Sequence, residues 1–172
     1  MGAFICTISE RDWPISREKG VYGNREKKEG TNEKLKDNQI QSIIRDLISM
    51  KEGDIVFFHI RGKQSIHGVY EIRKAPFYDT TNIFENIDEI FPYRFLYKPH
   101  TQYTYLAEYD ANIDVHSLYE YIDRGEIKSL VTLENEMNIE GRGVRKILME
   151  DANIIINLLH RDFKLRKSSE RL

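Results

Sequence analysis

Two apolar runs joined by a short polar turn are the feature that most restricts the fold of this chain. Ile55 to Ile60 is strongly apolar, and Ser65 to Arg73 is a second run rich in β-branched and aromatic residues. The segment between them, Arg61-Gly62-Lys63-Gln64, is typical of a hairpin turn. The centre of the chain is therefore predicted to be an antiparallel β-hairpin, around which a sheet is built.

Shorter patterns predict the remaining elements. Apolar spacing predicts a helix that is capped by Thr31 or Asn32 and ends at Ile48. Further strands are expected at Phe4–Ser9, Tyr93–Tyr97 and Tyr103–Glu108, and further helices at Val115–Ile122 and Glu150–Leu165. Lys19–Thr31 is expected to be a long loop, Gly141-Arg142-Gly143 a turn, and Phe77–Phe91 a loop with a short helical turn, because Pro76 lacks the N–H that a ladder needs. The fold class is α+β, with hairpin-linked strands closing into a small twisted barrel that helices flank.

The length of 172 residues and the mass of 20.4 kDa suit one compact domain. We expect this domain to occupy residues 1–165 and a charged linker to start at 166–172. No stretch approaches the roughly 18 consecutive apolar residues of a membrane span. Met1 to Cys6 is too short for a signal peptide, and the single Cys6 excludes an internal disulfide or a cysteine-built zinc site. A soluble, cytoplasmic protein with no membrane partner is expected.

Charge is unevenly distributed although the formal net charge is only −2. From Arg11 to Lys36 there are eight Lys or Arg against five Asp or Glu, and from Gly141 to Leu172 eight against four. Between Asp79 and Asp123 the ratio reverses to two against nine. The two ends could form one positive face that attracts a phosphate backbone, or the charges could simply form a solvated surface.

Signatures of catalysis are sparse. The sequence has no phosphate-cradling G-x-x-x-x-G-K-[ST] loop, no G-x-S-x-G elbow and no paired histidine or cysteine spacing for a metal. Asp54, Glu71 and Lys74 resemble a nuclease arrangement, but Glu71 and Lys74 are three residues apart and would point to opposite faces of a regular strand. We therefore predict no catalytic residue, no metal and no cofactor, and keep a metal-dependent nuclease only as an alternative.

Several aromatic residues lie beside turns and charges instead of on a periodic face. They are Trp13, Tyr22, Phe77, Tyr78 and Phe84. Such rings either cover the ends of a barrel or stack on a planar base.

Five segments of the chain form an ordered set: Phe4-Ile5-Cys6-Thr7-Ile8-Ser9-Glu10-Arg11-Asp12-Trp13, Gly20-Val21-Tyr22-Gly23, Lys51-Glu52-Gly53-Asp54-Ile55-Val56-Phe57-Phe58, Gly68-Val69-Tyr70-Glu71-Ile72 and Phe91-Pro92-Tyr93-Arg94-Phe95. In this order they resemble EVE domains, which are relatives of YTH domains in the PUA-like superfamily. The resemblance spans roughly residues 3 to 99, and Gly141-Arg142-Gly143 before the final helix also looks YTH-like. It implies a small twisted β-barrel with a pocket for a modified base that is flipped out of nucleic acid.

The resemblance also implies roles for particular residues. Tyr22 occupies the position at which the family usually has a tryptophan wall of the base-binding cage. The other implied cage residues are Trp13, Phe77, Tyr78 and Phe84. Backbone groups near Ser9, Gly23 and Asn24 are expected to bond the base edge. The residues expected to contact phosphate are Arg17, Lys19, Arg25, Arg142, Arg145 and Lys146.

The chain also resembles the N-terminal targeting domain of archaeal McrB-type restriction proteins. Those proteins work with a AAA+ motor and a nuclease subunit. The leading hypothesis is therefore a non-catalytic reader of N6-methyladenine in double-stranded DNA that acts by base flipping. A reader of modified RNA is the alternative within the same class. A nuclease and a pure protein-interaction module are alternatives from other classes.

Overall fold

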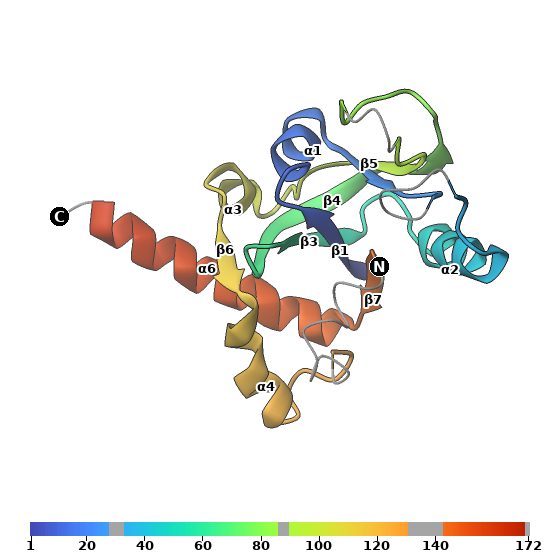
Figure 1. Ribbon diagram of the computed structural model, residues 1–172. Helices are drawn as coiled ribbons and strands as arrows, with labels where there is room; N and C mark the ends of the chain where they lie inside the picture. Colours follow the sequence, from blue (N-terminus) through green and yellow to red (C-terminus); the bar gives the residue numbers. More distant parts are fainter. Residues whose placement is uncertain (28–32, 86–89, 131–142, 171–172) are drawn as a thin grey trace.

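The computed structural model describes residues 1–27, 33–85, 90–130 and 143–170 (Figure 1). Its strands are β1 (Ala3–Ser9), β2 (Val21–Asn24), β3 (Ile55–Arg61), β4 (Ser65–Tyr78), β5 (Tyr93–Pro99), β6 (Asn112–Asp114) and β7 (Val144–Ile147). Its helices are α1 (Trp13–Lys19), α2 (Asp37–Ile48), α3 (Thr104–Glu108), the 3-10 helix η1 (Val115–Leu118), α4 (Tyr119–Asp123) and α6 (Met149–Glu170). The α+β fold class is confirmed.

One seven-stranded sheet organises the molecule in the order β2-β5-β4-β3-β1-β7, and β6 pairs with β4 outside this path. The predicted hairpin is its centre, since β3 and β4 pair antiparallel around the Arg61–Gln64 turn. Strand β1 pairs with β3 in parallel, with Ala3 opposite Ile55 and Ser9 opposite Arg61, whereas the other ladders are antiparallel.

The central strands are apolar throughout because both faces of the sheet are covered. In β3, Ile55 and Phe57 belong to one core cluster, and Val56, Phe58 and Ile60 belong to the other. The first cluster packs against α6, which lies across the sheet and continues away from it toward the C-terminus (Figure 1). The second cluster is rich in aromatic rings and lies on the opposite face, inside the curl of the sheet.

The sheet is twisted, and no ladder between β2 and β7 closes it in the described parts of the chain. A side chain bridges the opening instead. The Tyr22 hydroxyl on β2 lies 3.1 Å from the carbonyl oxygen of Thr7 and 3.0 Å from that of Gly143, the residue before β7. The two edges of the sheet are thus joined through one buried phenol.

Five predicted elements differ from the structure. The Tyr103–Glu108 segment, predicted as a strand, contains α3, because one helical turn directs Leu106 into one core cluster and Ala107 into the other. Strand β4 runs past Pro76, which lies at a register shift between Lys74 and Phe77, where a missing N–H is tolerated.

The other three differences concern a loop and two helices. The predicted loop Lys19–Thr31 contains β2, whose pairing with β5 compensates for its glycines. Helix α2 begins at Asp37 after Lys36, so the predicted caps Thr31 and Asn32, which lie outside the described residues, do not start it. Helix α6 also passes Leu165 and runs to Glu170, where an Asp162–Arg166 ion pair at 3.1 Å supports the added turns.

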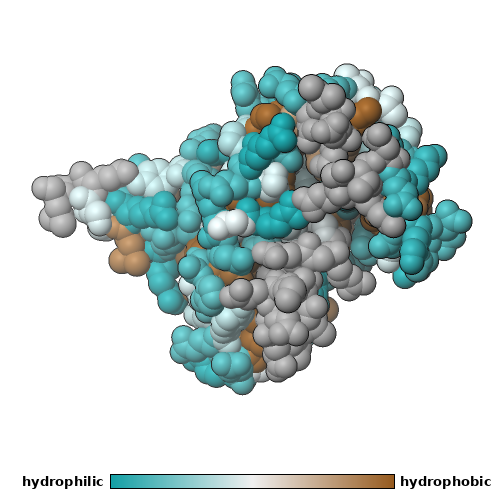
Figure 2. All heavy atoms as spheres, viewed as in Figure 1, coloured by the Kyte–Doolittle hydropathy of each residue, from teal (hydrophilic) through white to brown (hydrophobic). Residues whose placement is uncertain are grey.

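The surface drawn in Figure 2 is mainly hydrophilic, with small separate apolar patches. Among the described residues, no helix combines the length and apolar character that crossing a membrane requires.

Candidate functional site

A cavity of about 660 Å³ lies where the ends of β1 and β2 meet α2. Its other walls come from the turn after β1, from Arg61 at the end of β3, from Gly143, and from Phe84 and Phe91 before β5. The volume falls within the range of roughly 300–1,000 Å³ that is typical of small-molecule sites. It exceeds a single nucleobase, so a sugar and a phosphate could be accommodated as well.

Tyr22 forms a fixed wall of this cavity. The centre of its ring lies 5.2 Å from that of Phe95 and 6.1 Å from that of Phe58. Its hydroxyl bridges the sheet opening to the carbonyls of Thr7 and Gly143. Burial is the main cause that raises the pKa of Tyr22 well above its ordinary value. The phenol therefore remains protonated at neutral pH and shares its one hydrogen between those two carbonyls.

Asn24 follows on the same face of β2, because side chains two positions apart share a face. It is 9% exposed, and its Oδ1 accepts a hydrogen bond from the Arg25 N–H at 2.9 Å. Its Nδ2 is buried without a hydrogen-bond partner among the described residues. Gly143 permits this placement: its φ is +64°, and a Cβ there would lie 2.8 Å from Asn24 Nδ2.

Asp12 supplies a complementary group on the same cavity. It is 8% exposed, and its Oδ2 accepts a hydrogen bond from Ser9 Oγ at 2.8 Å. Its Oδ1 is buried and has no hydrogen-bond partner in the described parts of the chain. Asp12 and Asn24 thus each place one unpaired polar atom beside the cavity, an acceptor and a donor, and both atoms are shielded from solvent. Each such buried atom costs roughly 1–3 kcal/mol until it is satisfied, so the pair favours a ligand with both hydrogen-bonding types.

Positive charge predominates at this cavity. Arg11, Arg25 and Arg61 line it, against Asp12 and Asp46. The Arg25 guanidinium also lies 5.8 Å from the centre of the Phe91 ring. This arrangement suits an anionic group such as a phosphate.

The wall formed by Phe84 and Phe91 depends on a buried arginine that sequence reasoning missed. Arg94 is 0% exposed, and its guanidinium donates to the carbonyls of Phe91, Ile90 and Thr81. Its Nη1 also lies 3.5 Å from Asp79. Arg94 therefore anchors the segment between β4 and β5 to the sheet. An arginine between aromatic residues in a strand was the available signal, but its backbone partners could not be predicted.

The structure does not bring the five predicted cage rings into one slot. Tyr22 and Phe84 line the cavity. Trp13 does not line it: it is 6% exposed and packs 5.0 Å from Phe58 and 6.0 Å from Tyr70, because it begins α1, which packs against the aromatic core. Phe77 and Tyr78 lie outside the cavity lining, because β4 continues through them.

The residues predicted to bond the base edge all line the cavity, whereas most of the residues predicted to contact phosphate do not. Ser9, Gly23 and Asn24 all line the cavity. Of the basic residues, Arg25 lines it, whereas Lys19 bonds the Ile83 carbonyl at 3.2 Å and Arg145 bonds the Ser129 carbonyl at 3.0 Å. Lys146 is exposed on β7 away from the lining, and Arg142 lies outside the described residues. Arg11 and Arg61 were not predicted.

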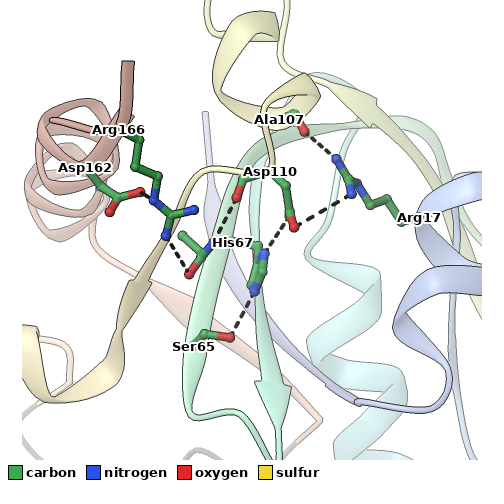
Figure 3. Close-up of polar contacts among 8 residues, drawn as sticks. Arg17, Ser65, His67, Ala107, Asp110, Asp162 and Arg166 are labelled. Carbon is green, nitrogen blue, oxygen red and sulfur yellow. Dashed lines mark hydrogen bonds and ion pairs between the residues drawn. The ribbon is translucent and has the colours of Figure 1, made fainter. Parts of the chain in front are cut away.

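Arg17 belongs to a separate polar network (Figure 3). It donates to the Ala107 carbonyl at 3.0 Å and lies 3.8 Å from Asp110. Asp110 in turn bonds His67 at 2.8 Å, and the other ring nitrogen of His67 lies 2.9 Å from Ser65 Oγ. This Ser-His-Asp order matches that of a nucleophilic triad, but Ser65 is buried in register with Asp114 of β6 and does not line the cavity. The network ties α1 to β4 and to the segment after α3.

The carboxylates of the nuclease alternative make structural contacts. Asp54 accepts hydrogen bonds from the backbone N–H groups of Gly2 and Lys51, both at 2.9 Å. Glu71 accepts from the backbone and hydroxyl of Thr101. Among the described residues, no group of three or more His, Cys, Asp or Glu is placed to hold a metal ion.

Comparison with known proteins places the fold in a class. No family model and no curated protein matches the sequence. Solved structures of YTH domains do match. The Pho92 YTH domain in complex with m6A has a TM-score of 0.59 at 15% identity, over 92% of this chain and 86% of that chain. The YTH domain of Zygosaccharomyces rouxii MRB1 protein in complex with N6-methyladenosine RNA has a TM-score of 0.55 at 13% identity, over 92% of this chain and 86% of that chain.

The DUF55 domain of human thymocyte nuclear protein 1 also matches, with a TM-score of 0.55 at 14% identity over 92% of this chain and 98% of that chain. At these identities the likeness establishes the fold alone. This chain therefore has the fold of YTH and DUF55 domains, which confirms the twisted sheet with flanking helices that the resemblance implied. The sheet curls without closing into a full barrel in the described parts of the chain.

Proposed function

We propose that this chain is a non-catalytic reader of a modified base in nucleic acid, which it receives in the cavity between β1, β2 and α2. The observation that carries the proposal is that two residues lining one cavity, Asp12 and Asn24, each hold a buried, unpartnered atom, the acceptor Oδ1 and the donor Nδ2. The edge of a nucleobase presents both donors and acceptors, so one base offers a partner to each of these two atoms. The shared fold with YTH domains solved in complex with m6A supports the same conclusion.

The mechanism we propose is base flipping. A base inside a duplex must first leave the stack, at a cost of a few kcal/mol, which single-stranded or already distorted sites reduce. Tyr22 and Phe84 then provide apolar walls for the base. Asp12 accepts from an exocyclic N–H, and Asn24 donates to a ring nitrogen. Arg11, Arg25 and Arg61 attract the phosphates, so binding weakens as salt concentration rises.

N6-methyladenine in DNA is the ligand we favour within this class. The methylated base keeps one N6–H donor next to a ring-nitrogen acceptor, which fits Asp12 and Asn24, and its methyl group adds apolar surface. We further propose that the chain targets a methylation-dependent restriction system of the McrB type, with a AAA+ motor and a nuclease subunit as partners. A Walker-type loop encoded downstream of codon 172 would support this role, and a downstream sequence unrelated to a motor would contradict it.

Titration of matched oligonucleotides tests the reader function. We expect tighter binding to a duplex with N6-methyladenine than to the unmodified duplex. Asn24→Ala and Asp12→Asn should each weaken this binding by about five- to 150-fold, the equivalent of roughly 1–3 kcal/mol. Asn153→Ala on α6 and Asp123→Asn at the end of α4, both exposed and outside the cavity lining, are matched controls. Equal affinity for modified and plain duplex would contradict the proposal.

A reader of modified RNA is the second candidate, and one observation favours it: the Zygosaccharomyces rouxii YTH domain was solved with N6-methyladenosine RNA. Competition between methylated RNA and methylated DNA of the same sequence separates the two candidates. Incubation of either polymer with Mg²⁺ or Mn²⁺ tests the nuclease alternative, which cleavage would support.

A further inference from the structure

A pair of aromatic rings, one of them exposed, lies on β4 and β5, the two strands next to β2 in the sheet. The Tyr78 and Tyr93 rings lie 5.3 Å apart, edge to face at 66°, on neighbouring strands β4 and β5. Tyr78 is 55% exposed, whereas most of the large apolar side chains of the sheet are buried. Tyr93 is partly buried and packs against the aromatic core cluster. One ring of the pair is therefore supported from below, and the other faces solvent.

Strand register connects this pair to the cavity. Asn24 of β2 is opposite Tyr93 of β5, and Tyr93 is opposite Tyr78 of β4. Residues directly opposite in antiparallel ladders point to the same face of the sheet. Asn24, Tyr93 and Tyr78 consequently form one row across three strands, which begins in the cavity and ends at an exposed ring.

Two further contacts fix the row in place. The Tyr78 hydroxyl donates a hydrogen bond to Glu26 at 3.2 Å, and Tyr93 is held between β2 and β4. Arg25 lies in the chain between Asn24, which lines the cavity, and Glu26, which contacts Tyr78. Arg25 itself lines the cavity, and its guanidinium lies 5.8 Å from the centre of the Phe91 ring, so a cation is available for a phosphate that joins the nucleotide in the cavity to its neighbour.

We infer that Tyr78 and Tyr93 form a stacking platform for the nucleotide next to the base held in the cavity, with Arg25 at the linking phosphate. This inference rests on the proposed function and extends it from one base to a dinucleotide step. Stacking on an aromatic side chain tolerates any base, because every base has a π-face. The platform therefore adds affinity for an unstacked strand and little preference for the flanking sequence.

Single-stranded probes with a central N6-methyladenine, in RNA and in DNA, test the platform. One set carries both flanking bases, and two further sets replace the 5′ or the 3′ flanking base by an abasic residue. For wild type, loss of one of the two flanking bases should weaken binding by at least about fivefold, the lower end of what base stacking contributes. Tyr78→Ala should bind the complete probe as weakly as wild type binds that abasic probe. Its affinity for the abasic probe should be no lower than its affinity for the complete probe.

Matched variants separate stacking from general damage to the fold. Tyr78→Phe keeps the ring and should keep the affinity. Phe77→Ala removes the neighbouring ring, whose centre lies 4.7 Å from Lys74 Nζ and which faces the other side of the strand. This variant should bind the probes like wild type. Free N6-methyladenosine should bind wild type and Tyr78→Ala equally.

The outcomes distinguish the two proposals. If wild type prefers methylated probes but Tyr78→Ala binds the complete probe with unchanged affinity, the platform is wrong and the reader function stands. The platform is also wrong if Tyr78→Ala weakens binding of the free nucleoside as much as binding of the complete probe. If wild type shows no preference for methylated probes, both proposals are overturned.

Discussion

The hydroxyl of Tyr22 lies 3.0 Å from the carbonyl oxygen of Gly143 and donates to it across the opening between the two edge strands of the sheet. The same hydroxyl lies 3.1 Å from the carbonyl oxygen of Thr7. Tyr22 therefore has two separable roles, since its ring forms a wall of the cavity and its hydroxyl holds the sheet in its curled shape.

Tyr22→Phe separates these roles. Removal of the hydroxyl takes one donor from the carbonyls of Thr7 and Gly143, and the Gly143 carbonyl still accepts from the Thr7 N–H at 2.6 Å. We therefore expect the free energy of unfolding in urea to fall by about 0.5–1.5 kcal/mol, the net value of a typical hydrogen bond. The ring remains, so the preference for a methylated base should survive wherever the variant is folded. Tyr103→Phe, which alters a hydroxyl outside this link, is the control. A variant as stable as wild type would show that the link is dispensable.

Arg94→Lys should loosen the wall that carries Phe84 and Phe91. A single ammonium group cannot reproduce the planar fork that reaches three carbonyls and Asp79. We expect a loss of about 1.5–3 kcal/mol in unfolding free energy, as for hydrogen bonds to charged groups. Limited proteolysis should cleave between β4 and β5 faster than in wild type.

Arg73→Lys on the exposed part of β4 provides the matched exchange for that experiment. It should leave both the unfolding free energy and the cleavage rate unchanged. If Arg94→Lys behaves in the same way, the anchoring role of Arg94 is wrong.

The central fold was predictable because it is encoded locally. The hairpin, β1 and the closing helix follow from runs of apolar residues and one turn. Such runs are long enough to require burial whatever the rest of the chain does, so the local pattern alone indicates the element. Strand β2 and helix α3 were not predictable in this way. Gly23 weakens β2 as an isolated strand, and only its ladder with β5 makes it one. In α3, contact of Leu106 and Ala107 with two different core clusters overrides the alternating pattern.

The site divides along a similar line. Ser9, Gly23, Asn24 and Tyr22 lie on two short segments that converge at the cavity, so their grouping could be predicted from the resemblance. Trp13 was predicted to line the base-binding cage, but it packs in the aromatic core and does not line the cavity. An aromatic residue that follows a strand does not indicate whether its ring enters the core or a cavity. Asp12 was missed, since its role depends on one carboxylate oxygen bonding Ser9 while the other stays unpaired. Such a division within one side chain has no signature in sequence.

Cys6 should be chemically silent in the folded chain. It is 0% exposed, and its pKa is raised well above the ordinary thiol value, first by burial and then by the nearby charge of Asp46. The thiolate is the reactive form, so both access and ionisation oppose reaction. We expect no modification by a thiol reagent at neutral pH in buffer and one modified thiol per chain in denaturant. Rapid modification in buffer would show that this part of β1 opens readily.

The Asp110–His67 contact should make stability depend on pH in the acid range. Burial alone would raise the pKa of Asp110, but the hydrogen bond from His67 and the charges of His67, Arg17 and Lys63 outweigh it and hold the pKa below the ordinary 3.8. A carboxyl whose pKa is lowered by folding stabilises the fold above the pKa it has when unfolded. That stabilisation is lost as the pH falls through the lower pKa of the folded state.

Urea unfolding of wild type and Asp110→Asn at a series of pH values measures this effect. At neutral pH the variant should be less stable by about 1 kcal/mol, because a charged partner of His67 and Arg17 is lost from a partly exposed site. Below the ordinary carboxyl pKa, the two stability curves should converge, since protonation removes the same charge from wild type. In the His67→Ala background, the Asp110→Asn substitution should change the pH profile less. Parallel curves for wild type and Asp110→Asn down to the acid limit of folding would contradict this assignment.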